Sequence, residues 1–346
     1  MRKWNWIGMI ITVVLLTGCV RTDKKKVFDS QYFEYFDTFT SFTVYAENEK
    51  QFEEYEKLFK SQLERYHQLF DIYESYSGMN NVRTINKNAG IAPVQVDDEI
   101  LELLEFSRKE YEKTGGKVNV AMGGVLLIWH EYRQTGIKNP EQAQLPSMQA
   151  LEKAAKHMDM DKVCIDRQKG TVYLSDPDMS LDVGAVAKGY AVEKICEELR
   201  KAGVTSALVN IGGNVQTIGA KEDKKPWRVG IQNPDLSASS PYLHALRLQD
   251  MALVTSGTYQ RYYEVDNIRY HHIIDPETLM PRQGYASVTV LCANGGVADA
   301  LSTALFNMSL EEGQKLIGSM EGTEAFWVLE DGNQVYSPGF EQYVED

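Results

Sequence analysis

The chain has 346 residues, 43% of them hydrophobic, and a formal net charge of −13. Apart from a short basic stretch near the N-terminus it contains no run of Lys and Arg, so we expect no nucleic-acid partner. No Pro/Gly/Ser-rich linker and no internal repeat divides the sequence, although its length exceeds that of one typical domain. We therefore expect one large domain, in which two lobes can be present.

The first residues, MRKWNWIGMIITVVLLTGCV, are typical of an export signal, because Arg2 and Lys3 precede a short apolar run that ends directly before Cys19. The run is shorter than the about 20 apolar residues of a membrane span. It resembles a bacterial lipoprotein signal, so we expect a signal peptide over 1–18, lipid on Cys19, and a location on the extracytoplasmic face of a bacterial membrane. An uncleaved anchor helix is the alternative. The polar, basic residues that follow predict a flexible tether over 19–30 and a folded domain over 31–346.

The elements expected in the first half are one strand and three helices. Residues 40–46 alternate as a strand does, and residues 48–73 show the apolar spacing of a long amphipathic helix. A helix over 97–116 begins with acidic residues and is closed by Gly115 and Gly116. The third helix is expected over 147–158.

The second half predicts many short strands between two further helices. The helices are expected over 185–203 and 297–308, and residues 206–219 indicate a strand, a glycine turn and a second strand. The other strands are expected over 162–166, 171–175, 227–232, 242–248, 251–257 and 268–275. This order predicts an α+β fold with largely antiparallel sheets and flanking helices. Three cysteines without close spacing, Cys164, Cys196 and Cys292, indicate buried free thiols.

Four segments place polar residues at the ends of apolar elements: LDVGAVAKGY at 181–190, VNIGGNV at 209–215, TSGTYQRYY with RYHHIIDPETLMP over 255–281, and ADALSTAL at 298–305. In the last of these, Asp299 and Thr303 are four residues apart, so a helix directs both side chains the same way. A carboxylate and a hydroxyl are half of a site for Mg²⁺. Alternatively, Asp299 caps the helix behind Gly296.

Together these segments resemble the FAD:protein FMN transferase family, often called ApbE, from about Tyr35 to the C-terminus. The resemblance implies a single T-fold-like α+β domain, FAD as substrate and Mg²⁺ as cofactor. It also implies transfer of FMN to a Ser or Thr hydroxyl of membrane or extracytoplasmic electron-transfer proteins, with release of AMP. Two other functions remain open: Mg²⁺-dependent hydrolysis of FAD to FMN and AMP, and flavin binding without catalysis.

The resemblance carries over to individual residues. It implies that Mg²⁺ is bound by Asp299, Thr303 and the backbone carbonyl of Ala185. It implies that FAD is contacted by Asn119, Ala121, Asp182, Lys188, Gly212, Gly213, His272 and a tyrosine, Tyr73 or Tyr76, of which we select Tyr76. His272 and Lys188 are the expected catalytic residues, His272 as a base or a phosphate ligand and Lys188 as a counter-charge to pyrophosphate.

Each of these residues also has a structural interpretation. Lys188 and Asp182 are as typical of solvated charges at a helix start as of ligand-binding residues. The Gly212–Gly213 pair is also typical of an ordinary hairpin turn. The tyrosines suit core packing as well as ring stacking. Because strand side chains alternate, we expect His271 to point away from the site if His272 faces it. The segment Phe36-Asp37-Thr38 departs from the Met-Gly-Thr-like triplet of the family.

Overall fold

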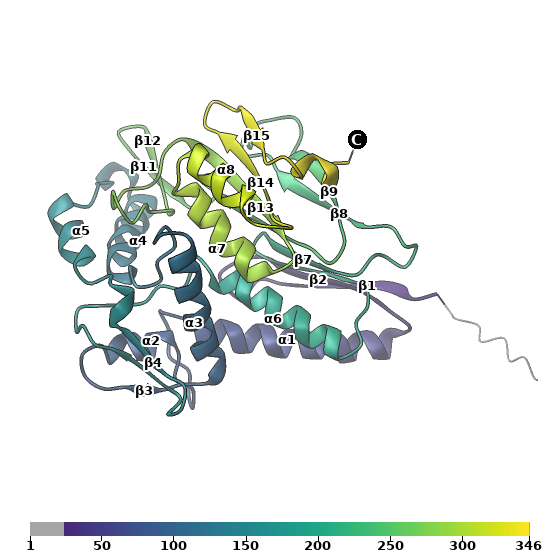
Figure 1. Ribbon diagram of the computed structural model, residues 1–346, viewed down its shortest axis with the longest axis horizontal. Helices are drawn as coiled ribbons and strands as arrows, with labels where there is room; N and C mark the ends of the chain where they lie inside the picture. The colour runs from purple at the N-terminus through teal and green to yellow at the C-terminus, as the bar shows by residue number, and fades with distance from the viewer. Residues whose placement is uncertain (1–23, 346) are drawn as a thin grey trace, which may run out of the picture.

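The computed structural model describes residues 24–345. An eight-stranded antiparallel sheet organises the protein, with the strand order β1-β2-β6-β7-β10-β13-β14-β15 (Figure 1). These strands are β1 (Lys26–Tyr32), β2 (Thr40–Ala46), β6 (Ala207–Ile211), β7 (Asn214–Ile218), β10 (Ala252–Gly257), β13 (Tyr285–Cys292), β14 (Glu324–Leu329) and β15 (Gln334–Tyr336).

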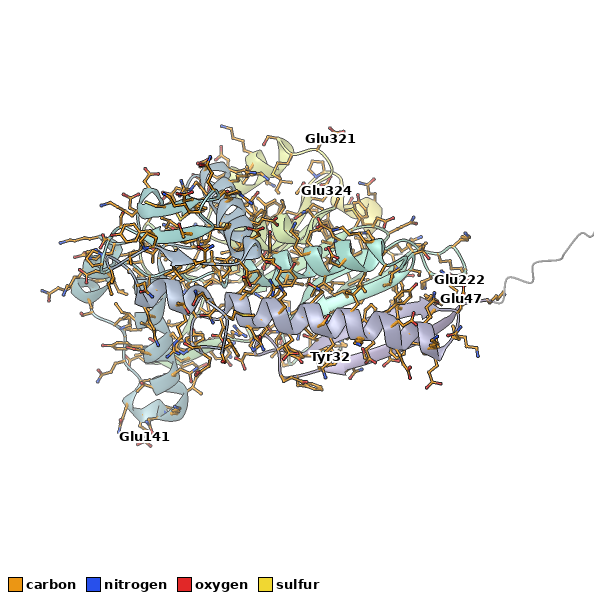
Figure 2. The ribbon with its side chains drawn as sticks, turned by 90° about the horizontal axis from the view of Figure 1, so that it is seen from below. Tyr32, Glu47, Glu141, Glu222, Glu321 and Glu324 are labelled. Carbon is orange, nitrogen blue, oxygen red and sulfur yellow. The ribbon has the colours of Figure 1, made fainter. Side chains whose placement is uncertain are left out.

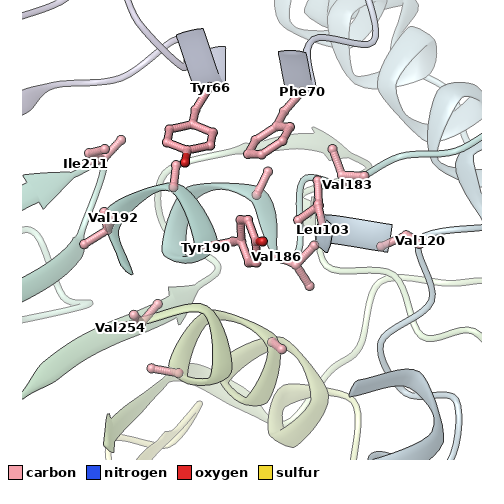
Figure 3. Packing of buried hydrophobic residues seen from close by; sticks show 14 of the residues in the cluster. Tyr66, Phe70, Leu103, Val120, Val183, Val186, Tyr190, Val192, Ile211 and Val254 are labelled. Atoms are coloured by element: carbon pink, nitrogen blue, oxygen red, sulfur yellow. The ribbon is translucent and has the colours of Figure 1, made fainter. Parts of the chain in front are cut away.

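Helices cover one face of this sheet. They are α1 (Glu49–Phe70), α6 (Ala187–Lys201), α7 (Gly295–Phe306) and α8 (Leu310–Gly318), with α3 (Asp98–Lys113) packed beside α7. Helix α1 buries Tyr55, Phe59, Leu63, Tyr66 and Phe70, whose spacing of three or four residues produces one apolar stripe. Figure 3 shows Tyr66 and Phe70 of this stripe above Tyr190 of α6, with Val254 of the sheet on the far side of α6. The largest core therefore lies between α1, α6, α7 and the sheet.

A hairpin of β8 (Trp227–Gln232) and β9 (Tyr242–Leu248) covers the other face of the sheet. Buried and exposed positions alternate strictly along β8, so that Trp227, Val229 and Ile231 face inward. They share a second core with Leu253 and Phe326, which point to the opposite face from the helix-packed residues of the same strands. The central sheet is thus buried on both sides.

A lobe at one end of the sheet carries the remaining elements (Figure 1). It contains α4 (Gly123–Lys138), α5 (Met148–Ala155) and the hairpin of β11 (Tyr262–Val265) and β12 (Ile268–His271), which share a third core. The short helix α2 (Val82–Lys87) and a small sheet of β3 (Val94–Gln95), β5 (Thr171–Leu174) and β4 (Val163–Asp166) lie beside it. Trp129 of α4 closes the lobe by donating a hydrogen bond from Nε1 to the Leu279 carbonyl, at 2.9 Å.

The α+β fold with antiparallel sheets and flanking helices is confirmed, and most elements lie where the sequence predicts them. Two of the predicted elements are clearly shorter than expected: the helix over 147–158 ends at Ala155, and the strand over 268–275 ends at His271. The helices α2, α4 and α8 and the strands β1, β3, β11, β13, β14 and β15 were not predicted from the sequence. One prediction about cysteines is wrong: Cys164 is exposed, because it alternates with the buried Val163 on β4, whereas Cys196 and Cys292 are buried.

The prediction of a flexible tether over 19–30 is wrong for residues 26–30, which belong to a strand. Strand β1 begins at Lys26 and pairs along its full length with β2, from Lys26 opposite Ala46 to Tyr32 opposite Thr40. Lysines are typical of edge strands, where they discourage further pairing, and Phe28 of this strand stacks on Phe52 of α1 with ring centroids 4.9 Å apart. The predicted signal peptide and Cys19 lie outside the described residues. Within residues 24–345, no helix combines the length and apolar composition that a membrane crossing needs.

The acidic excess of the sequence is spread over distant parts of the surface. Figure 2 shows Glu47 and Glu222 at the end where the described chain begins, whereas Glu141, in the segment after α4, lies at another corner.

Candidate active site

The first turns of α6 and α7 touch each other, and Asp299 bridges them. The start of α6 has no side-chain cap of its own; instead, the N–H of Gly189 donates to Oδ2 of Asp299, at 2.8 Å. A Cβ atom at Gly189 would overlap the carbonyl oxygen of Gly295 and the Cβ of Asp299. Glycine at 189 therefore permits the contact that brings Asp299 to the N-terminal end of α6, where helix N–H groups favour negative charge.

Asp299 is only 4% exposed and does not cap its own helix, because Asn294 performs that role through the N–H of Val297. In the described part of the chain, one hydrogen bond reaches this carboxylate, and burial raises its pKa although Lys188 and the Gly189 N–H act against the rise. A buried carboxylate with so little compensation is costly unless a cation neutralises it. The alternative of a plain helix cap is thereby removed.

Two further oxygen donors belong to the same elements. Thr303 lies one turn after Asp299 on α7, and Ala185 precedes α6. Carboxylate, hydroxyl and carbonyl oxygens are the donors that Mg²⁺ prefers, and it commonly completes its shell with water and substrate phosphate. The chemistry of this donor set fits Mg²⁺.

The loop that carries Asp182 is held by the backbone and by a side chain that the sequence did not single out. Asn86 of α2 accepts from the Leu181 N–H at 2.7 Å and donates to the Leu181 carbonyl at 2.9 Å, as a neighbouring strand would. The N–H of Asp182 donates to the Val120 carbonyl, and Oδ1 of Asp182 accepts from Gly184. Burial raises the pKa of Asp182, whereas the Gly184 N–H, His130, Lys188 and Arg133 lower it.

Asn119 and Ala121 lie next to Asp182, but their side chains are engaged elsewhere. Asn119 donates from Nδ2 to the Met158 carbonyl and accepts from the Ala121 N–H, at 2.9 and 2.8 Å. Ala121 is fully buried. The segment around these residues shapes the loop against Asp182, and the prediction that they contact FAD remains a prediction.

The two neighbouring histidines have different surroundings. His271 is buried, bonds through Nε2 to the Arg282 carbonyl at 2.7 Å and accepts the Ile273 N–H at Nδ1, so both ring nitrogens are used. His272 follows the end of β12, and its Nδ1 is buried with no hydrogen-bond partner among the described residues. Burial first, then the charges of Arg261 and Arg133, lower the pKa of His272 to about 3. His272 is therefore neutral at pH 7, and its Nδ1 is free to bind a ligand or a proton.

Tyr73, the tyrosine that we did not select, lies nearer to these charges than Tyr76. Tyr73 is 50% exposed, its hydroxyl lies 3.3 Å from Nδ1 of His130 on α4, and burial followed by the charge of Asp182 raises its pKa to about 12. Tyr76 instead donates to Asp71 at 2.7 Å and lies near His67. The charges of Asp182, Arg133 and Arg261 act on Tyr73, whereas the Tyr76 hydroxyl is bound to Asp71.

The glycine turn between β6 and β7 faces the segment that departs from the family pattern. Gly212 and Gly213 have φ of 57° and 86°, the left-handed values of a tight hairpin turn, and a Cβ at Gly212 would collide with Thr38. Nothing lies within 4 Å of a Cβ at Gly213, so one side of the turn is open. Arg261 donates to the Asp37 carbonyl at 3.3 Å and thereby connects this turn to the histidine segment.

A second group of potential metal ligands, His157, Asp176 and Asp178, is found in the described chain. Nδ1 of His157 lies 2.9 Å from Asp176, whereas Nε2 lies 3.8 Å from Asp178. The two carboxylates thus approach opposite edges of one ring, which suits a bridging histidine better than a single metal ion.

The starts of α6 and α7, with Lys188 near the buried carboxylate of Asp299 and the partly buried carboxylate of Asp182, combine positive charge with helix N–H groups and so suit a phosphorylated ligand. The sequence pattern of the ApbE family matches residues 36–327, and the chain belongs to this family. The family assignment made from the four segments is confirmed.

Individual relatives agree with this assignment. The chain is 34% identical over 261 residues to an FAD:protein FMN transferase of Treponema pallidum, a match that covers 71% of this chain and 70% of that protein. A Klebsiella pneumoniae protein of the same name is 30% identical and matches 80% of this chain and 82% of its own. The crystal structure of the ApbE protein of Thermotoga maritima superposes with a TM-score of 0.80 at 28% identity, covering 93% of this chain and 100% of that chain.

Proposed function

We infer that the protein transfers the FMN moiety of FAD to a Ser or Thr hydroxyl of another protein and releases AMP. Membership in the ApbE family and the curated FMN transferases among its relatives support the reaction. The observation in the chain itself that carries it is the buried carboxylate of Asp299, which lies at the start of α6 near Lys188. A site of this kind suits a pyrophosphate and a cation.

Different residues of the protein would bind the phosphates and accept the proton. Lys188 and the first N–H groups of α6 offset phosphate charge, and neutral His272 can accept the proton of the attacking hydroxyl. A pKa of about 3 makes His272 a weak base in the free protein, because Arg261 and Arg133 act on it beside burial. An anionic substrate would offset those charges and raise the pKa of His272 towards a useful value. Mg²⁺ held by Asp299, Thr303 and the Ala185 carbonyl would stabilise the charge that develops on the leaving phosphate.

The test is to incubate the purified protein with FAD, Mg²⁺ and a candidate acceptor domain, and to measure the acceptor mass. An increase by one FMN supports transfer. Free FMN and AMP without any increase would identify a hydrolase instead, and unchanged FAD that stays bound would identify a flavin-binding protein without catalysis.

We expect His272→Ala to slow transfer by about 10²-fold or more, because a positioned proton acceptor contributes on this order. His271→Ala should instead lower the melting temperature, since the Arg282 carbonyl and the Ile273 N–H lose their partner inside the fold. Transfer rates per folded molecule and thermal unfolding of both variants check this. Equal rate losses in the two variants would contradict the separate roles.

We also propose that the protein is a lipoprotein on the extracytoplasmic face of the membrane and modifies electron-transfer proteins there. β1 pairs Lys26 with Ala46 and Tyr32 with Thr40, and Thr40 pairs with Ile211 beside the glycine turn. Seven strand residues separate the chain entry from the site by about 20 Å. The site would then open away from the anchored end, towards acceptor proteins.

Replacement of Cys19 by Ala should release the protein from the membrane or leave it unprocessed, while the purified folded domain keeps its activity. Membrane fractionation and the mass of the N-terminal peptide check this. Wild-type protein that is exported without lipid and remains wholly in the soluble fraction would refute the anchor.

A further inference from the structure

A second cationic group, Arg133 and Arg261, lies near His272. Arg133 comes from α4, and Arg261 comes from the segment between β10 and β11. The charges of both arginines lower the pKa of His272, and the charge of Arg261 acts more strongly on Arg133 than any other charge does. The charge of Lys188 acts on His272 as well, so three cations lie near one neutral imidazole.

Within residues 24–345 neither arginine forms a close ion pair, although the charge of Asp182 acts on Arg133. Arg133 lies partly buried, and its Nη2 is 3.3 Å from Nδ1 of His130, a neutral partner shared with the Tyr73 hydroxyl. Arg261 reaches the Asp37 carbonyl at 3.3 Å, and its nearest carboxylate, that of Asp37, is fully exposed at 3.9 Å. The repulsion between two guanidinium groups with so little compensation costs free energy, and an anion bound by both would recover it.

His272, on which the charges of both arginines act, has a free ring nitrogen. Its Nδ1 is buried and has no partner among residues 24–345, so a buried polar atom awaits a group that the chain does not supply. A planar guanidinium pair suits a phosphate group, because each fork can offer two parallel N–H donors.

We propose that Arg133 and Arg261 form a phosphate-binding half-site near His272 that holds the flavin-side phosphate of the substrate and is distinct from the Asp299–Lys188 group. The assignment of the flavin-side phosphate rests on the proposed function. If His272 accepts the acceptor's proton, the attacked phosphorus lies beside it, and that phosphorus belongs to the FMN moiety. The AMP phosphate then lies on the Asp299–Lys188 side. Tyr73, half-exposed beside His130 and Arg133, offers an aromatic surface next to the flavin phosphate.

The half-site is tested by titrating the full-length protein with FMN, riboflavin and AMP. In Arg133→Gln and Arg261→Gln we expect FMN to bind about 10- to 100-fold more weakly, the range for a lost charged hydrogen bond, with little change for riboflavin or AMP. Arg269→Gln is the matched control, because Arg269 pairs with Glu264 on the β11–β12 hairpin and should leave all three affinities unchanged. Weaker AMP binding with unchanged FMN binding would overturn the assignment.

Two further measurements separate binding from a structural role. Without ligand, Arg133→Gln should raise the melting temperature, because it removes repulsion with Arg261; a lower melting temperature with unchanged affinity for FMN would overturn the proposal. The pKa of His272, measured by NMR titration, should rise in either variant. Each variant removes one of the positive charges that lower this pKa.

A failure of the proposed function can be distinguished from a failure of the half-site. If the wild-type protein binds no flavin, inorganic pyrophosphate becomes the probe of the half-site. Loss of pyrophosphate binding in both arginine variants, but not in Arg269→Gln, would retain the half-site without the flavin. Unchanged pyrophosphate binding in both variants would overturn it.

Discussion

Asp299→Ala is expected to abolish FMN transfer, with a loss on the order of 10³-fold or more, because a cation bound there supplies several kcal/mol of charge stabilisation. The same change also leaves the Gly189 N–H without its partner, which costs about 1–3 kcal/mol. Asp299→Asn separates the two effects, since an amide oxygen can still accept from Gly189 while the charge is gone. We expect the Asn variant to melt no lower than the wild-type protein and still to be inactive.

The measurement is FMN transfer as a function of Mg²⁺ concentration, with chelator as the reference. Thr303→Ala should need more Mg²⁺ and recover part of its rate at high concentration, since it lacks only a neutral donor. Ala185→Gly should be mild, because the backbone oxygen survives the change. Full activity of Asp299→Asn in chelator would refute the metal site.

The elements with a strong local pattern were predictable from the sequence, and those without one were not. Helix α1 has its apolar stripe, and β2 and β8 alternate between buried and exposed residues. Helix α4 begins without a capping side chain and buries only four of its 16 residues, so it lacks both signals. Strand β13 is buried at almost every position because helices cover one face and a hairpin the other, which removes the alternation.

The candidate site was predictable where its residues stand within the family's motifs. Lys188, Asp182, Asp299 and His272 were selected in this way, and the structure places the other three near the charge of Lys188, while their roles remain predictions. Arg133 was missed because it belongs to the helix that had no signal. Arg261 stands inside a quoted motif, but its role depends on Asp37, more than 200 residues earlier, and no local pattern contains that contact.

The role of Asn86 was also not predictable from the sequence. Its side chain replaces a strand partner for Leu181 and so fixes the backbone beside Asp182. The two residues are 95 positions apart, and a single Asn near a short helix is typical of an ordinary cap or turn. Such supporting contacts become visible only once the tertiary fold brings the segments together.

Gly189→Ala should damage the fold and the site together, although it adds one methyl group. The added Cβ would overlap the Gly295 carbonyl and the Cβ of Asp299, so the starts of α6 and α7 would have to separate. Overpacking of this kind costs about 1–3 kcal/mol or more, and a displacement of about 1 Å between catalytic groups can cost 10²-fold in rate. We expect a melting temperature lower by several degrees and transfer reduced by about 10²-fold or more.

Gly318→Ala is the matched control, since Gly318 also lies in a helix, α8, but no atom is within 4 Å of an added Cβ. Alanine is favoured over glycine in helices by up to about 1 kcal/mol, so this variant should be as stable as the wild type or slightly more stable, with full activity. Thermal unfolding and FMN transfer of both variants are measured side by side. If Gly189→Ala matched Gly318→Ala in both, the close contact between the two helix starts would not be what holds Asp299 near Lys188.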